Sequence, residues 1–146
     1  MTKIRRATVA DVDQLTDLVE QYRAFYKQEP NAKTKQYLTD RLTNGESIVF
    51  VADDNGTLVG FTQCYPTFST VSLSQIWLLN DLFVDPNHRG KHIADELMVM
   101  AESEAKAAGA TRIWLRTAHT NTPAQALYEG RGWVQDEVFR RYDLIF

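Results

Sequence analysis

The sequence predicts an α/β fold in which one mixed, mostly antiparallel sheet is flanked by four helices. Two observations lead to this class. An Asp-Asp-Asn-Gly turn at 53–56 joins two β-rich runs, which is a strong signal for an antiparallel hairpin. An apolar strand at 75–84, a helix at 93–108 and a strand at 112–117 then form a strand–helix–strand crossover, and this crossover makes the sheet mixed.

The four helices are predicted from apolar side chains at helical spacing and from the residues at their ends. The first begins at a capping box, formed by Thr8 with Asp11 three residues on, and ends before Pro30. The others end at glycines, because glycine readily adopts the left-handed conformation that closes a helix. They are expected over 35–43, 93–108 and 121–131.

The strands follow the β-rich runs of the sequence. A short strand at 3–7 opens the chain, and two strands at 133–136 and 139–145 are expected to close it as a hairpin. The Ser- and Thr-rich segment 66–74 is expected to be a loop. The element order is therefore β-α-α-β-β-β-α-β-α-β-β, and without a repeat or internal linker it fits a single domain over 1–146.

Composition excludes several classes of function. The 146 residues carry a net charge of -3, so general affinity for nucleic acid is not expected. Cys64 is the only cysteine, so there is no internal disulfide and no cysteine cluster for a metal; we read Cys64 as a buried structural thiol. No apolar run approaches the roughly 20 residues that span a bilayer. We expect a cytoplasmic protein without a metal.

The turn between the strand 75–84 and the helix 93–108 is a candidate anion site. It carries Arg89, Gly90 and Lys91 directly before the helix. The first amides of a helix have no partner within it, and the helix dipole adds partial positive charge at that end. Alone this pattern is weak evidence, because an ordinary solvated loop has the same composition.

A second motif lies about thirty residues further on. It reads Asn-Thr-Pro-Ala-Gln-Ala-Leu-Tyr from Asn121 to Tyr128 and is followed by Gly-Arg-Gly-Trp. Together the two motifs resemble the GNAT superfamily of acetyl-CoA-dependent N-acetyltransferases. The resemblance is sharp from Asn80 to Trp133. Around Asn80–Val84 it is most similar to the polyamine and small histone-type acetyltransferases.

The resemblance implies how acetyl-CoA is bound. The backbone of Leu82, Phe83 and Val84 would pair with the pantetheine arm, and the turn into the following helix would hold the pyrophosphate. Asn121, with Ala124 on the same helix, would contact the cofactor arm. The implied pyrophosphate residues are Arg89, Gly90, Lys91, His92, Ile93, Ala94 and Asp95.

One position departs from the family pattern, since the family usually has glycine where this chain has His92. Glycine lets the backbone approach a phosphate without a Cβ. We expect His92 to fit if its φ is helical and its side chain points away. A protonated imidazole in contact with a phosphate is the alternative.

The resemblance also places Tyr128 near the sulfur. A phenol with a reference pKa of about 10 stays protonated at neutral pH and can donate a proton to a departing thiolate. The base is less well defined. Asp81 is a candidate for binding or deprotonating the amine, and a structural acid, a water route or Glu29 are alternatives. Successive side chains of a regular strand face opposite ways, so Asn80 and Asp81 are not both expected in the acceptor cleft.

The acceptor pocket is expected to be built by Tyr22, Tyr26, Glu29 and Asn80, with the segment 66–74. Helical spacing also fits Tyr22 and Tyr26 as core residues. A small-molecule amine such as a polyamine is the first choice of acceptor. A protein lysine or N-terminal amine, an aminoglycoside-like amine and a non-catalytic acetyl-CoA-binding module are alternatives, and relatives suggest a homodimer.

Overall fold

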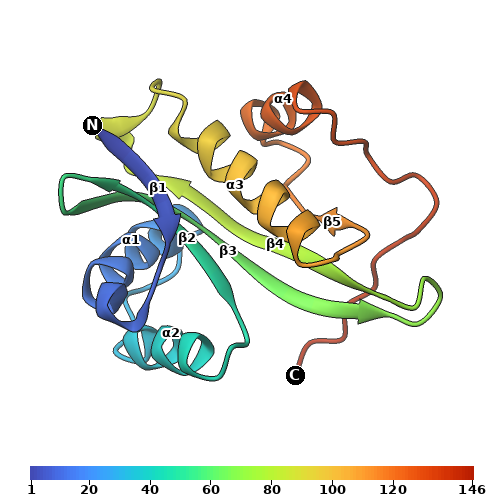
Figure 1. Ribbon diagram of the computed structural model, residues 1–146, viewed down its shortest axis with the longest axis horizontal. Coiled ribbons are helices and arrows are strands. Elements are labelled where there is room, and N and C mark those ends of the chain that lie inside the picture. Colours follow the sequence, from blue (N-terminus) through green and yellow to red (C-terminus); the bar gives the residue numbers. More distant parts are fainter. The chain divides into compact units, whose positions relative to one another are not determined.

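The computed structural model describes residues 1–146. The chain forms two compact units, Met1–Leu115 and Arg116–Phe146. The first unit contains the whole sheet and three α-helices, and the second contains the fourth helix (Figure 1).

The first unit is built on one five-stranded sheet. Its strands lie in the order β1-β2-β3-β4-β5, and the first three pairings are antiparallel while β4 and β5 are parallel. The predicted mixed, mostly antiparallel sheet is therefore confirmed. The strands are β1 (Thr2–Arg6), β2 (Ile48–Asp54), β3 (Thr57–Ser69), β4 (Ser74–Val84) and β5 (Ile113–Trp114).

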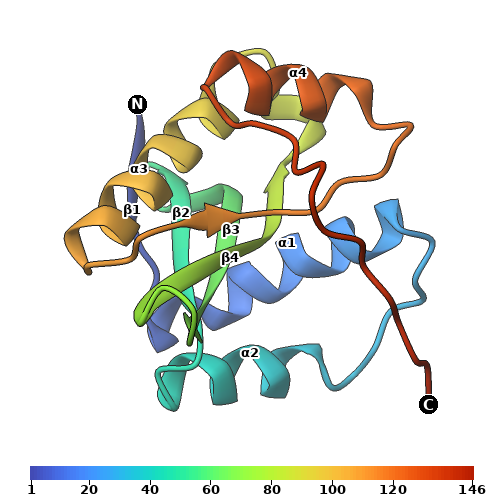
Figure 2. The same ribbon diagram turned by 90° about the vertical axis from the view of Figure 1, so that its right-hand side faces the viewer.

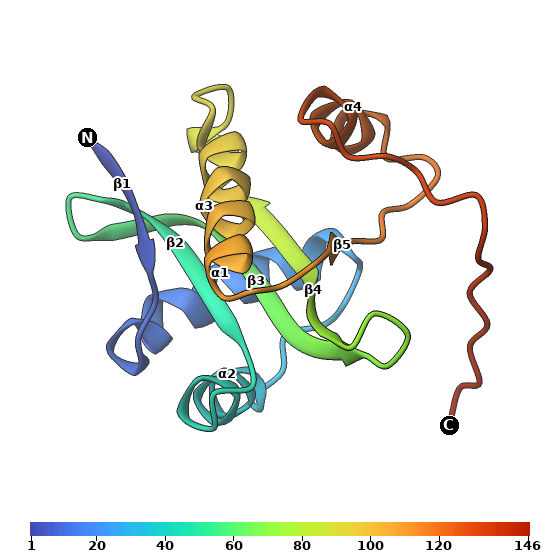
Figure 3. The ribbon, with the colours of Figure 1, turned by 45° about the vertical axis from the view of Figure 1, so that its right-hand side comes forward.

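Helices cover both faces of this sheet. α1 and α2 lie on one face and α3 lies across the other (Figures 2 and 3). No helix is both long and apolar enough to pass through a lipid bilayer. The helices are α1 (Val12–Phe25), preceded by the 3-10 turn η1 (Val9–Asp11), α2 (Thr34–Thr43), α3 (Ile93–Ala107), preceded by the 3-10 turn η2 (Pro86–His88), and α4 (Thr122–Gly130).

The core fills the space on both sides of β2, which is why the run Ile48–Ala52 of this strand is apolar without interruption. Val49 and Val51 belong to a buried cluster that also contains Leu15 of α1. Phe50 and Ala52 alternate with them and are equally buried. Two apolar faces mark a strand covered on both sides, in agreement with the helices seen above and below the sheet.

The hairpin predicted at 53–56 is present. Asn55 and Gly56 have φ values of 53° and 94°, as expected for the two central residues of a tight hairpin turn. The loop predicted at 66–74 is correct only for the turn at 70–73, because β3 continues to Ser69 and pairs with β4 from Ser74 onward. Pro66 is tolerated there because β2 pairs with β3 only as far as Cys64, so the missing N–H faces an unpaired edge.

The two strands predicted at 133–136 and 139–145 do not form. Their apolar side chains, among them Phe139 and Ile145, are exposed. A two-stranded hairpin alone is marginal in water, because it buries too little apolar surface. Alternating apolar residues were therefore not sufficient to make strands here.

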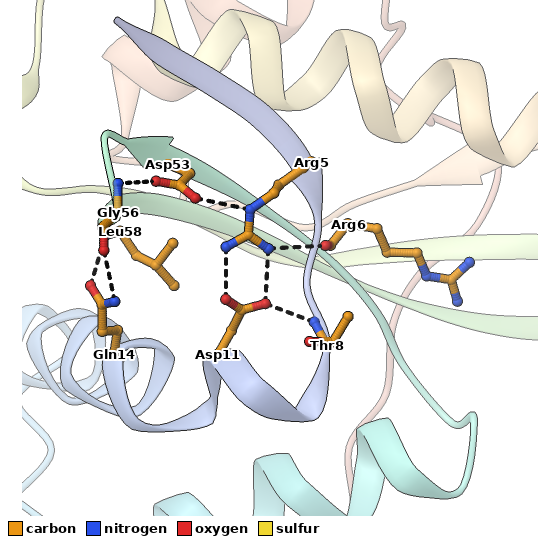
Figure 4. Close-up of polar contacts among 8 residues, drawn as sticks. All are labelled: Arg5, Arg6, Thr8, Asp11, Gln14, Asp53, Gly56 and Leu58. Atoms are coloured by element: carbon orange, nitrogen blue, oxygen red, sulfur yellow. Dashed lines mark hydrogen bonds and ion pairs between the residues drawn. The ribbon is translucent and has the colours of Figure 1, made fainter.

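One ion-pair network ties the start of the chain to the hairpin (Figure 4). The Arg5 guanidinium contacts both carboxylate oxygens of Asp11 at 2.7 and 2.9 Å, and its Nε donates to Asp53 at 3.0 Å. Asp11 also accepts from the Thr8 N–H at 2.8 Å, which is the contact that the capping box predicts. Arg5 thus joins β1, η1 and β2.

Removing the guanidinium should destabilise the protein in a pH-dependent way. The bond from Arg5 lowers the pKa of Asp11, and the Gly56 amide followed by Arg5 lowers the pKa of Asp53. Depressed carboxylate pKa values contribute stability above the unfolded pKa of about 3.9, and this stability is lost as the pH falls through the folded values. We expect Arg5→Met to cost about 1–3 kcal/mol at pH 7 and far less below about pH 3, as measured by denaturant unfolding.

Arg6→Met is the matched control, because its side chain points away from this network (Figure 4). It should leave the unfolding free energy within about 0.5 kcal/mol of wild type. An Arg5→Met cost that persists undiminished in acid would contradict the electrostatic origin.

Candidate active site

The turn from β4 into α3 has the geometry of an anion site. It opens at Asp85, whose carboxylate accepts from the Asn87 N–H and whose carbonyl accepts from the His88 N–H, both at 2.8 Å. The chain then passes Gly90 at φ 76° and enters α3 at Ile93. The first amides of α3 have no acceptor within the helix, so they are available to an external anion.

The two basic residues of this turn differ in their contacts, since Arg89 is held by its neighbours and Lys91 is exposed. Arg89 Nε donates to the Val84 carbonyl at 3.0 Å, and its guanidinium carbon lies 5.6 Å from the centroid of the Phe83 ring. Lys91 is exposed. A Cβ on Gly90 would meet nothing within 4 Å, so glycine is required here by its positive φ rather than by space.

His92 does not have the backbone that we expected. Its φ is 62° and its ψ is 16°, which is left-handed rather than helical. Left-handed backbone costs a non-glycine residue roughly 1–2 kcal/mol because Cβ approaches a carbonyl oxygen. The imidazole is exposed, so the side chain does not repay that strain by burial. The position therefore favours the glycine of the family pattern on backbone grounds.

The end of β4 offers an unpaired backbone edge. β5 pairs only with Trp77 and Leu78, so within the first unit Leu79–Val84 has no strand on its β5 side. Along 82–84 this edge offers backbone groups to an extended ligand, apart from the Val84 carbonyl, which already accepts from Arg89 Nε. The edge leads directly into the turn at the start of α3.

A bulge interrupts β4 at Asn80. Gln63 of β3 pairs with Asp81, whereas Cys64 pairs with Leu79, so Asn80 has no partner across the ladder. An extra residue on one strand re-aims the side chains beside it. The expectation that Asn80 and Asp81 face opposite ways is therefore wrong, because it applied to a regular strand. Both residues line one pocket.

That pocket has a volume of about 340 Å³ and lies between the sheet and the α1–α2 side of the first unit. Its wall combines apolar side chains, three phenols and one acid. The lining residues are Val19, Tyr22, Arg23, Asn31, Lys33, Thr34, Tyr37, Leu38, Phe61, Gln63, Tyr65, Asn80 and Asp81.

Glu20 holds the segment between α1 and α2 that forms one wall of the pocket. Its carboxylate accepts from the Thr34 hydroxyl, from the Asn31 N–H at 3.2 Å and from Arg23 at 3.1 Å. The hydrogen bond from Thr34 is the main cause that lowers the pKa of Glu20. Arg23 also donates to the Glu29 carbonyl at 2.8 Å, so this cation has partners on both sides.

Asp81 is the acid of the pocket. It accepts from Gln63 Nε2 at 2.9 Å, and Asn80 Nδ2 lies 3.1 Å from both of its carboxylate oxygens. Burial raises the pKa of Asp81, and the hydrogen bonds from Gln63, Asn80 and Tyr22 oppose that rise. A carboxylate shifted in this direction is a better proton acceptor than one in water.

The structure brings some of the predicted acceptor residues together and leaves others out. Tyr22 lines the pocket and packs against the core, with its ring centroid 5.7 Å from Phe61 and 5.9 Å from Phe83. Both interpretations of Tyr22 thus have support. Tyr26 and Glu29 are exposed and do not line the pocket, although the Tyr26 ring packs edge-on against Tyr22 at 5.1 Å between centroids. Their acceptor role stays a prediction.

Most of the lining residues were missed from the sequence, among them Gln63, Tyr37 and Tyr65. Gln63 is a polar residue inside an apolar strand, and this contrast is the sequence signal that could have identified it as a pocket residue. Tyr37 and Tyr65 come from α2 and β3, and their hydroxyls lie 2.7 Å apart. Tyr65 lies outside any motif, so only the folded chain reveals its partner.

The second unit contains the later motif. Asn121 caps α4, and its side-chain oxygen accepts from the Ala124 N–H at 3.3 Å. The Tyr128 ring lies 6.1 Å from the Trp133 ring, measured between centroids. This cap and this aromatic pair show that the motif forms a defined helix. The roles expected for Asn121, Ala124 and Tyr128 stay predictions.

Cys64 is free and buried, as expected for a structural thiol. Burial raises its pKa to about 12. We therefore expect no reaction with an aromatic disulfide reagent at pH 8 in the native protein and one reactive thiol after denaturation. Absorbance at the thiolate product measures both values. Rapid labelling of the native protein would contradict the buried position.

Comparisons with known proteins agree with this geometry. The Acetyltransferase (GNAT) family model matches residues 13–133. An uncharacterised N-acetyltransferase of Bacillus subtilis, YhfO, is 42% identical over 142 residues, which cover 97% of this chain and 95% of the relative.

Solved structures share the fold. A probable acetyltransferase superposes with a TM-score of 0.93 at 35% identity, covering 99% of this chain and 97% of the other. A structure of a predicted acetyltransferase from Clostridium acetobutylicum with acetyl-CoA has a TM-score of 0.79 at 18% identity, covering 98% and 96%. Because the family model matches residues 13–133, which is most of the chain, the chain belongs to the GNAT family of N-acetyltransferases.

Proposed function

We propose that this N-acetyltransferase transfers an acetyl group from acetyl-CoA directly to a primary amine of a small molecule, with a polyamine as the first choice of acceptor. The observation that carries the proposal is the bulge at Asn80. It aims Asp81 into a pocket on one face of β4, while the same strand offers an unpaired edge that leads to a basic helix start. The proposed acid for the amine and the proposed binding edge for the cofactor thus both belong to β4.

The residues of the first unit fit acetyl-CoA. An extended arm would pair with Leu82–Val84, and the amides at the start of α3 would hold the pyrophosphate, with charge from Arg89 and Lys91. When bound, acetyl-CoA supplies the acetyl carbon that bonds to the amine nitrogen as its C–S bond breaks. Asn121 at the start of α4 is proposed to contact the cofactor arm.

Protons move at two proposed positions. Asp81 binds the ammonium and takes the first of the two protons that leave its nitrogen, directly or through water, which gives the neutral nucleophile. Tyr128 donates its hydroxyl proton to the departing CoA sulfur. The second nitrogen proton leaves as the amide forms and matches the proton that Tyr128 gives to sulfur, and solvent returns a proton to Tyr128. The proton held by Asp81 then passes to water, so each turnover releases one proton.

Two other functions remain distinguishable by experiment. A protein lysine or N-terminal amine would require an acceptor that enters the pocket as a side chain or chain end. A non-catalytic acetyl-CoA-binding module would have no need of a proton donor at Tyr128. A cytoplasmic location and a homodimer stay predictions of the sequence.

Tyr128→Phe tests the proposed enzyme directly. It keeps the ring and removes only the hydroxyl, so we expect kcat to fall about 10²-fold or more while the KM for acetyl-CoA changes little. Thiol release with a panel of polyamines, monoamines, aminoglycosides and lysine peptides measures the rate and selects the acceptor. Tyr142→Phe, an exposed tyrosine, is the control and should keep full activity. Binding of acetyl-CoA without turnover of any amine would identify a binding module.

His92→Gly tests the helix start. Glycine relieves the left-handed backbone, so we expect unfolding free energy to rise by up to about 1 kcal/mol and acetyl-CoA binding to be kept or tightened. Ala94→Gly, inside the first helical turn, should instead lower the unfolding free energy by about 1 kcal/mol. Calorimetric titration and denaturant unfolding give the two quantities. More than tenfold weaker binding in His92→Gly would show that the imidazole itself contributes.

A further inference from the structure

Gln63 is an unusual residue for its position. It lies in the middle of β3 and is only 3% exposed. Its amide nitrogen donates to Asp81 Oδ2 at 2.9 Å, whereas its side-chain oxygen is buried without a hydrogen-bond partner. One end of this side chain is thus satisfied by the acid of the pocket, and the other end is not satisfied at all.

The orientation of the amide follows from the chemistry of its neighbour. An ionised carboxylate only accepts hydrogen bonds, so the nitrogen of Gln63 has to face Asp81 and the oxygen has to face away. A buried acceptor without a donor costs roughly 1–3 kcal/mol. An apolar side chain of similar length would avoid that cost on a strand whose neighbours Phe61 and Cys64 are also buried. The burial of the side chain therefore does not account for a glutamine here, and its bond to the Asp81 carboxylate is the feature that does.

We propose that Gln63 is the positioning residue of the acceptor site, holding the Asp81 carboxylate so that one oxygen faces the incoming amine. Oδ2 accepts from Gln63, and Asn80 Nδ2 lies between the two oxygens at 3.1 Å from each. Tyr22 also donates to this carboxylate, so side chains from α1, β3 and β4 together fix its orientation in the pocket. This inference rests on the proposed function, since it assigns a role within the same pocket.

Gln63 also affects how readily Asp81 holds its charge. The groups that face Asp81 are Tyr22 from α1, Cys64 and Tyr65 from β3, and Asn80 from β4, and all are uncharged at neutral pH. The cations Arg23 and Lys33 line the same pocket. Burial raises the pKa of Asp81 and the bond from Gln63 lowers it. Loss of that bond should therefore raise the pKa further.

The experiment compares Gln63→Met, Gln63→Glu and Asp81→Asn with wild type. We expect Gln63→Met to keep or raise Tm and to keep the KM for acetyl-CoA. Its kcat/KM for the amine should fall at least about tenfold at pH 7, and the acid limb of its pH profile should move up by about one unit. Gln63→Glu should move the acid limb to still higher pH, because two carboxylates in contact resist ionisation. Asp81→Asn should abolish the acid limb, because it removes the titrating group.

Carbon-13 NMR titration of the Asp81 carboxyl group in the free protein gives a readout that needs no turnover. We expect the titration of Asp81 to move to higher pH in Gln63→Met than in wild type. Ser47→Ala is the matched control, because Ser47 is also buried with an unpartnered side-chain oxygen but does not line the pocket. It should leave the titration and kcat/KM as in wild type.

The outcomes separate the two proposals. Wild type that turns over an amine while Gln63→Met keeps an unmoved pH profile and an unmoved Asp81 titration would overturn the role of Gln63 alone. A Gln63→Met variant that loses Tm and changes both KM values in parallel would show a structural role instead. Wild type that releases no CoA with any amine would overturn the proposed function.

Discussion

The irregularity of β4 is the constraint on which the candidate site depends. A regular strand would send Asn80 and Asp81 to opposite faces of the sheet, and only one of them would reach the pocket. The extra residue in the ladder with β3 brings both side chains to one side. Beyond the short pairing with β5 the same strand has an edge that is unpaired within the first unit, so one element carries both a pocket wall and the backbone proposed to pair with an extended ligand.

Burial and hydrogen bonding act against each other at Asp81. The low polarity of its surroundings favours the neutral acid, whereas the amides of Gln63 and Asn80 favour the carboxylate. Burial is the larger influence, so the pKa of Asp81 is raised and this carboxylate takes up a proton more readily than a solvated aspartate does. The unsatisfied oxygen of Gln63 is consistent with a site in which a functional contact outweighs local stability.

The rest of the first unit provides the rigid support that such a site needs. The Arg5 network fixes the entry into α1, and Glu20 fixes the segment that follows it, so both ends of the helix that carries Tyr22 are anchored by charged groups. α3 packs its buried face on the opposite side of the sheet and presents its start to solvent. The strained backbone of His92 lies at that start, where an anion would bind.

The sequence by itself determined the class of fold and the place of the turn from β4 into α3, because hydrophobic periodicity, the Asn-Gly turn and the helix-ending glycines are local signals. Those signals failed at 66–74 and at the last two strands, since pairing there depends on partners that the local pattern does not reveal. Only the tertiary structure decided that Asn80 and Asp81 share a pocket and that Gln63 and Tyr65 join them. A bulge is a property of two strands in register, and the burial that shifts the pKa of a carboxylate is created by residues far away along the chain.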